Sequence, residues 1–188
     1  MSDNEYWYKY YRQKYYDSCY EINNCNNRIY NLKNQRQQKV NTINKLNVDI
    51  NNTQTALENL EEILKSETSL NTKLVAVENK TRDASVNFTG MVNSSNVKSK
   101  NLSEIYSEET TQTKNKLNNI LSIFKTKKYN LSTRLNELRS NLSCANSDLQ
   151  GIDSGIRKAN SDISYWKQQK NSNNYNMEYY RRKMMQEV

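Results

Sequence analysis

Residues 121–166 have the sequence LSIFKTKKYNLSTRLNELRSNLSCANSDLQGIDSGIRKANSDISYW. Two interleaved rows of residues recur in it at intervals of seven. The Leu121 row contains Leu121, Lys128, Leu135, Leu142, Leu149, Ile156 and Ile163, and the Phe124 row contains Phe124, Leu131, Leu138, Ala145, Ile152, Ala159 and Trp166. Thirteen of these fourteen residues are apolar. A stripe with this period stays on one side of a helix only if the helix supercoils around a partner helix.

A second stripe with the same period lies near the N-terminus. The Tyr8 row contains Tyr8, Tyr15, Ile22, Ile29, Arg36, Ile43, Ile50, Leu57 and Leu64, and the shorter Tyr11 row contains Tyr11, Cys25, Leu32, Leu46 and Leu60. Two stripes of similar length, separated by one break, are natural partners for each other. The sequence therefore predicts an all-α fold, a long antiparallel two-helix hairpin of the coiled-coil type.

The composition supports one narrow apolar interface between two helices, which we call the seam, rather than a globular core. The 188 residues include no proline, no histidine and only three glycines, Gly90, Gly151 and Gly155. Only 35% of the residues are hydrophobic, and the mean hydropathy is −1.07. The abundant asparagine and the net charge of +8 favour intrinsic disorder as a competing interpretation. The regular heptads argue against it, because disordered segments have no need of such a period.

The pattern also predicts where the helices begin and end. The expected divisions are a hairpin over 1–170, with helix one at about 4–83, a turn at about 84–96 and helix two at about 97–170, and a short helical C-terminal tail over 171–188. The turn contains serines, asparagines and Gly90, and a polar run over 171–174 interrupts the pattern before the tail. We expect Asp3 or Asn4 to cap helix one, and a kink where the pattern weakens over 66–71.

A turn centred near Phe88 predicts which residues face each other. Leu57 then lies opposite Leu121, and Tyr8 and Tyr11 lie opposite Trp166. This places aromatic residues at the open end of the hairpin, namely Tyr6, Trp7, Tyr8, Tyr11, Tyr165 and Trp166, and the tail adds Tyr179, Tyr180 and Met184. Such residues are enriched where proteins bind partners. The alternative is that the tail folds back and buries them.

The sequence lacks the residues that several kinds of functional site require. Without histidine or a glycine-rich loop, we expect no enzymatic activity, no cofactor and no metal site, and Cys19, Cys25 and Cys144 lack metal-ligand spacing. Cys25 belongs to the Tyr11 row, so we expect a small buried side chain there. The basic residues are spread along the chain, which argues against specific nucleic-acid binding. No signal peptide or transmembrane segment is recognisable, so we expect a cytoplasmic protein.

The turn carries the sequence Phe88-Thr89-Gly90. With the hairpin, it resembles the WXG-type superfamily of bacterial type VII secretion, whose members carry Trp-x-Gly between two long helices. In pattern, the similarity covers most of residues 5–165 and is greatest to the larger relatives associated with LXG-type toxins in low-GC Gram-positive bacteria. Two departures are that Phe88 replaces the tryptophan and that the Tyr-x-x-x-Asp/Glu export signal is absent after helix two. The missing signal fits a helper or a chaperone better than an independently secreted protein.

The resemblance implies a non-enzymatic protein that binds a helical partner, either a toxin leader or a small WXG-type protein, and that is exported with it or remains in the cytoplasm. Phe88, Gly90, Met91 and Val92 would form the docking motif at the turn. Alternatively, Phe88 caps the end of the seam. A structural coiled-coil scaffold or spacer is the competing function, and homo-oligomerisation stays open.

Overall fold

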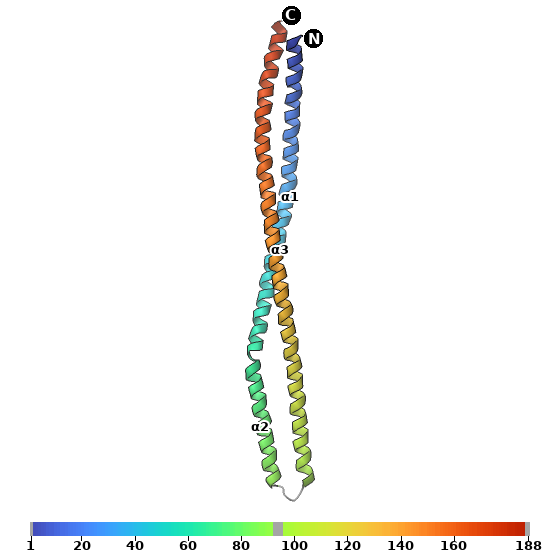
Figure 1. Ribbon diagram of the computed structural model, residues 1–188, viewed down its shortest axis with the longest axis vertical. Coiled ribbons are helices and arrows are strands. Elements are labelled where there is room, and N and C mark those ends of the chain that lie inside the picture. Colours follow the sequence, from blue (N-terminus) through green and yellow to red (C-terminus); the bar gives the residue numbers. More distant parts are fainter. Residues whose placement is uncertain (1, 92–95, 187–188) are drawn as a thin grey trace. The chain divides into compact units, whose positions relative to one another are not determined.

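The computed structural model describes the backbone of residues 2–91 and 96–186 and the side chains of residues 2–84, 104–105 and 107–186. Over this part the chain forms the helices α1 (Asp3–Lys65), α2 (Glu67–Met91) and α3 (Asn96–Gln186), and no strand (Figure 1). Because α3 runs antiparallel to α1 and α2, the predicted all-α helical hairpin is confirmed.

α1 and α2 together form the first arm of the hairpin, and α3 forms the second. The first arm is interrupted at Ser66, within the stretch where the heptad pattern weakens. Ser66 lies in a turn, and its backbone N–H donates to the carbonyl oxygen of Ile63 over 3.1 Å. This i to i−3 bond is tighter than the α-helical one and ends α1. The heptad phase survives the interruption, because Leu60, Glu67 and Leu74, spaced by seven, are all half-buried.

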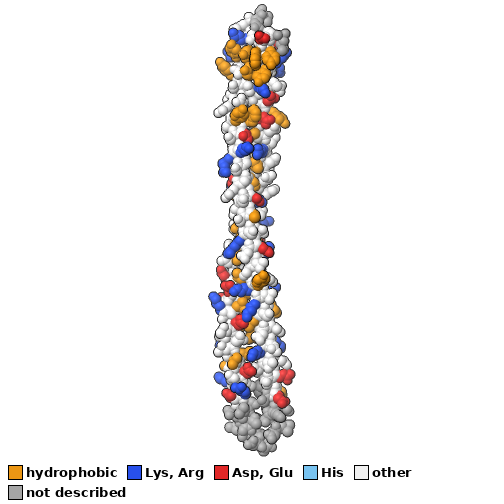
Figure 2. Space-filling view, viewed as in Figure 1, with side chains coloured by type: hydrophobic (Ala, Val, Ile, Leu, Met, Phe, Trp, Pro, Cys, Tyr) orange, Lys and Arg blue, Asp and Glu red, His pale blue; other side chains and the backbone are white. Residues whose placement is uncertain are grey.

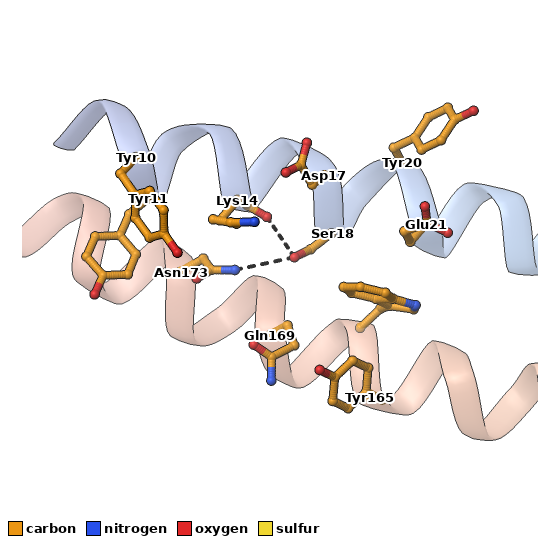
Figure 3. A pocket seen from close by; sticks show the side chains of 11 residues that line it. Tyr10, Tyr11, Lys14, Asp17, Ser18, Tyr20, Glu21, Tyr165, Gln169 and Asn173 are labelled. Carbon is orange, nitrogen blue, oxygen red and sulfur yellow. Dashed lines mark hydrogen bonds between the residues drawn. The ribbon is translucent and has the colours of Figure 1, made fainter. Parts of the chain in front are cut away.

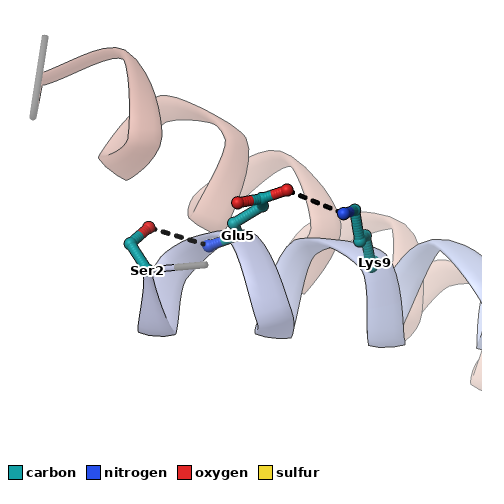
Figure 4. Close-up of polar contacts among 3 residues, drawn as sticks. All are labelled: Ser2, Glu5 and Lys9. Atoms are coloured by element: carbon teal, nitrogen blue, oxygen red, sulfur yellow. Dashed lines mark hydrogen bonds and ion pairs between the residues drawn. The ribbon is translucent and has the colours of Figure 1, made fainter.

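The N-terminal cap is Ser2 rather than the expected Asp3 or Asn4. The Ser2 hydroxyl oxygen accepts a hydrogen bond from the Glu5 backbone N–H at 3.3 Å, and the Glu5 carboxylate accepts one from Lys9 at 2.7 Å (Figure 4). Ser2-x-x-Glu5 matches the spacing of a capping box. The Lys9 ammonium holds the pKa of Glu5 below its ordinary value, first through this hydrogen bond and then through its charge.

The turn is shorter than predicted, and the predicted tail is not separate. α2 continues to Met91, so Phe88 and Gly90 lie inside a helix, and α3 passes through 171–174 to Gln186 without a break. Serine, asparagine and an isolated glycine each cost up to about 1 kcal/mol of helix stability, whereas proline would cost about 3. The chain has no proline. Packing along the seam offsets the weak helix formers at the C-terminal end.

The contacts divide the chain into two units, which are residues 1–47 with 140–188 (unit 1) and residues 48–139 (unit 2). In unit 1, the first part of α1 packs against the last part of α3, and the side chains of Ala145 and Ala159 are buried between them. In unit 2, the end of α1 and α2 pack against the first part of α3, with Leu121, Leu135 and Leu138 buried.

All four heptad rows lie at the seam. Every member of the Leu121 and Phe124 rows is buried or half-buried, and so is every member of the Tyr8 row except Arg36. The two charged members reach acidic partners on the opposite arm. Arg36 pairs with Asp153 at 2.7 Å in unit 1, and Lys128 pairs with Glu61 at 3.0 Å in unit 2. Because these pairs are partly exposed, each contributes at most about 1 kcal/mol.

The pairing register differs from the one that a turn at Phe88 predicts. Leu32 lies beside Gly155, where an added Cβ atom would be 3.3 Å from Leu32 Cδ1, and Lys125 pairs with Glu67 at 2.8 Å. Because the connection lies between Met91 and Asn96, each residue of the first arm meets a residue further along α3 than predicted. Gly155 therefore permits close approach of the arms, whereas an added Cβ atom at Gly151 would meet nothing within 4 Å.

Candidate partner-binding surface

Three stacked aromatic rings join α1 and α3 in unit 1, near the two ends of the chain. Tyr11 stacks with Tyr180 at 5.8 Å between ring centroids and an interplanar angle of 10°, and Trp7 stacks with both, at 6.0 and 6.2 Å. Aromatic pairs add about 0.5–1.5 kcal/mol beyond the burial of their area. The prediction that Tyr8 and Tyr11 face Trp166 was wrong, because the register brings Tyr180 to this position.

The part of unit 1 that contains this stack has more aromatic side chains than the two helices cover. The exposed members, which we call the aromatic end, are Tyr6, Trp7, Tyr10, Tyr16, Tyr20, Tyr165, Tyr175 and Tyr179. In Figure 2, hydrophobic side chains gather in the part of unit 1 where the termini lie. In the last part of α3, which continues without folding back, Tyr180 and Met184 are half-buried, whereas Tyr179 and Tyr175 are 45% and 70% exposed.

A groove lined partly by the aromatic end holds a polar pair, in which Ser18 is buried and Asn173 is half-buried. The Ser18 hydroxyl group, 1% exposed, donates to the carbonyl oxygen of Lys14 at 2.8 Å and accepts from the Asn173 amide at 3.4 Å (Figure 3). The groove is lined by Tyr10, Tyr11, Lys14, Asp17, Ser18, Tyr20, Glu21, Tyr165, Trp166, Gln169 and Asn173. This lining offers aromatic faces together with hydrogen-bonding groups of both charges.

Cationic side chains lie over several tyrosine rings in this part of unit 1. Lys170 lies 5.5 Å from the ring centroid of Tyr15, Lys14 lies 5.8 Å from that of Tyr10, and Lys183 lies 5.9 Å from that of Tyr179. At exposed sites such contacts contribute about 0.5–1 kcal/mol. They hold the tyrosines in place and thereby reduce the side-chain entropy lost when a partner binds.

Ser18 and Asn173 were missed by the sequence analysis, although their positions carry a signal. Counting in sevens from Tyr11 reaches Ser18, and counting on from Trp166 reaches Asn173 and Tyr180. The same count from Ile163 reaches Lys170, Met177 and Met184. Polar residues interrupted the apolar pattern, so the seam was predicted to end too early.

The predicted turn motif is only partly described. Phe88 and Gly90 lie within α2, and Met91 is its last residue, but the side chains of Phe88 and Met91 lie outside the described residues, as does Val92 altogether. Their role in docking therefore stays a prediction.

The three cysteines are free thiols with different surroundings. Cys25 is half-buried in the seam, as the Tyr11 row predicts, and Cys144 is exposed. Burial raises the pKa of the Cys25 thiol, and the nearby carboxylates of Asp162 and Glu21 raise it further. A protonated thiol is a poor nucleophile, so Cys25 serves packing better than chemistry.

Neither a metal-binding cluster nor a membrane span is found in the part of the chain that the structure describes. No group of three or more cysteine, aspartate or glutamate side chains in this part is arranged so that it could hold a metal ion. No helix within the described residues is long and apolar enough to cross a membrane. Comparison of the chain with protein-family models, with curated proteins and with solved structures found no match in any of the three.

Proposed function

We propose that this protein is a non-enzymatic helical hairpin that binds a helical partner protein through its aromatic end. The observation that carries the proposal is the exposure of the aromatic end, where Tyr20 and Tyr175 are 65% and 70% exposed. Tyrosine, tryptophan and arginine dominate the binding energy of protein interfaces. Leaving so many rings in water gives the hairpin itself little stability, whereas a partner would cover them.

The resemblance to the WXG-type superfamily supports a role in type VII secretion, with a toxin's helical leader or a small WXG-type protein as the partner. The hairpin would act as a helper or a chaperone for that partner. It would work in the cytoplasm or leave the cell with the partner, without a signal peptide. These assignments depend on the hairpin and on the Phe88-Thr89-Gly90 motif.

The test is capture of partners from the native cell by the tagged full chain. Tyr20→Ser with Tyr175→Ser should reduce recovery of the partner at least tenfold, because two anchor rings are lost. Tyr129→Ser is a matched control, since Tyr129 is 72% exposed but belongs to unit 2 and not to the aromatic end. Equal losses from both changes would contradict the proposal.

A second measurement separates the secretion role from that of a scaffold. If the captured partner is a toxin, deletion of this protein should lower the amount of toxin that accumulates or is exported. Unchanged toxin levels, with altered cell or complex architecture, would favour the structural scaffold instead.

A further inference from the structure

Unit 2 carries a second apolar surface, which lies outside the seam and outside the aromatic end. Ile63, Leu70 and Val77 recur at intervals of seven along α1 and α2, and they are 47%, 44% and 55% exposed. On α3, Ile120 and Ile123 are 48% and 57% exposed and lie three residues apart, on one helix face. We call these five residues the lateral face.

The contacts across the seam place both parts of the lateral face on one side. Gln54 and Arg139 each follow a seam position, and they are hydrogen-bonded across the seam at 3.3 Å. Residues that come directly after such a seam position in the sequence, on either arm, therefore lie on one side of unit 2. Ile63 and Ile120 directly precede the seam residues Leu64 and Leu121, so in an antiparallel pair they share the opposite side.

The ion pairs also fix the level of these residues along the helices. Glu67 pairs with Lys125 at 2.8 Å, which sets the alignment of the two arms at this point. Leu70 is three residues beyond Glu67, and Ile123 and Ile120 are two and five residues before Lys125. Leu70 consequently lies level with Ile120 and Ile123, with Ile63 and Val77 about 10 Å to either side along the helix.

Three lysines lie close to the lateral face. Lys73 lies one turn beyond Leu70, Lys116 lies one turn before Ile120, and Lys127 follows Ile120 by seven residues. All three lysines are exposed, and none has an ion-pair partner among the described side chains. The lateral face is therefore an apolar strip with three unpaired lysines beside its centre, and Glu62 and Glu78 adjoin Ile63 and Val77 at its two ends.

We propose that the lateral face binds an acidic amphipathic helix of a partner protein. This inference rests on the proposed function, and it adds the chemistry of the partner. A helix is the element that can follow a strip that repeats every seven residues, and carboxylates beside its apolar stripe would meet the three lysines. A second copy of this chain fits poorly, because docking the same face on itself would bring lysines against lysines.

The test uses the full chain and two synthetic helical peptides of about four heptads. Both carry leucine and isoleucine at the first and fourth positions of each heptad, with glutamate at the flanking positions in one and lysine in the other. We expect the glutamate peptide to bind at least tenfold more tightly than the lysine peptide, by fluorescence anisotropy, and its affinity to fall as salt is raised.

Variants of the chain locate the site. Leu70→Asp should weaken the glutamate peptide at least tenfold, whereas Val48→Asp should not, because Val48 is 57% exposed in the same unit but lies off the lateral face. Lys73→Glu with Lys116→Glu should reverse the preference between the peptides while leaving helicity, by circular dichroism, unchanged. This charge variant keeps the test valid if Leu70→Asp disturbs folding.

Three results of the peptide and self-association measurements would overturn the inference. They are equal binding of the two peptides, equal effects of Leu70→Asp and Val48→Asp, and self-association of the chain that Leu70→Asp abolishes, which would make a second copy the occupant. If the native partner is lost with Tyr20→Ser and Tyr175→Ser but retained with Leu70→Asp, the aromatic end alone binds it and the lateral face does not. Loss with Leu70→Asp alone would support the lateral face and reject the aromatic end.

Discussion

Leu138→Ala tests the seam directly, because Leu138 is the most deeply buried large side chain of unit 2, at 2% exposure. Truncating a buried leucine to alanine costs about 2–5 kcal/mol, from lost transfer free energy and the cavity left behind. Two packed helices can partly close such a cavity, so we expect about 3 kcal/mol. For a chain of this length that corresponds to a fall in melting temperature of roughly 6–12 °C.

The matched control is Ile123→Ala on the same helix. Ile123 is 57% exposed, so most of its surface is in water before the change, and we expect a cost below about 1 kcal/mol. Asn136→Asp, at an exposed position off both heptad rows, should be nearly neutral. Thermal unfolding followed by circular dichroism measures all three. Equal losses for Leu138→Ala and Ile123→Ala would refute the seam and its burial.

Three further predictions concern single positions in unit 1. Asn173→Leu should raise the melting temperature, because it places an apolar side chain at the seam while Ser18 keeps its bond to Lys14, and the exposed Asn171→Leu should not. Ser2→Ala should cost about 1 kcal/mol through loss of the N-terminal cap, and Ser2→Gly less, as amide hydrogen exchange at Glu5 would report. In variants with one cysteine, an alkylating reagent at neutral pH should label Cys144 readily and Cys25 slowly, because the raised pKa of Cys25 keeps its thiol protonated. Labelling of Cys25 should increase only as the pH rises above the ordinary thiol range. Fast labelling of Cys25 at neutral pH would contradict its place in the seam.

The heptad rows predicted the fold class and nearly all of the seam, because positions that are buried at intervals of seven are mostly occupied by apolar residues. They failed where polar residues occupy seam positions. Ser18 and Asn173 satisfy each other there, and Lys128 reaches Glu61, so position rather than polarity decides which residues are covered. The C-terminal end of the seam was predicted too early for the same reason, because Asn173 lies in the polar run that was predicted to end the regular pattern.

The register was not predictable from the rows alone. Sliding one arm along the other by a heptad keeps the rows in contact, so the position of the turn decides the pairing. Serine, asparagine and glycine near Phe88 resemble a turn, yet each lowers helix stability only slightly, and α2 continues to Met91. The lateral face depends on this register as well, because Leu70 meets the level of Ile120 only in the observed pairing.

Disulfide cross-linking tests this register most directly. A chain with Leu32→Cys and Gly155→Cys, with Cys19→Ser and Cys25→Ser, and with Cys144 retained, offers the thiol at position 32 two possible partners. The structure places Gly155 beside Leu32, so mild oxidation should join the two introduced thiols within one chain, as peptide mass mapping would show. A disulfide between position 32 and Cys144, the partner that a turn centred at Phe88 requires, would contradict the pairing on which both proposed surfaces depend.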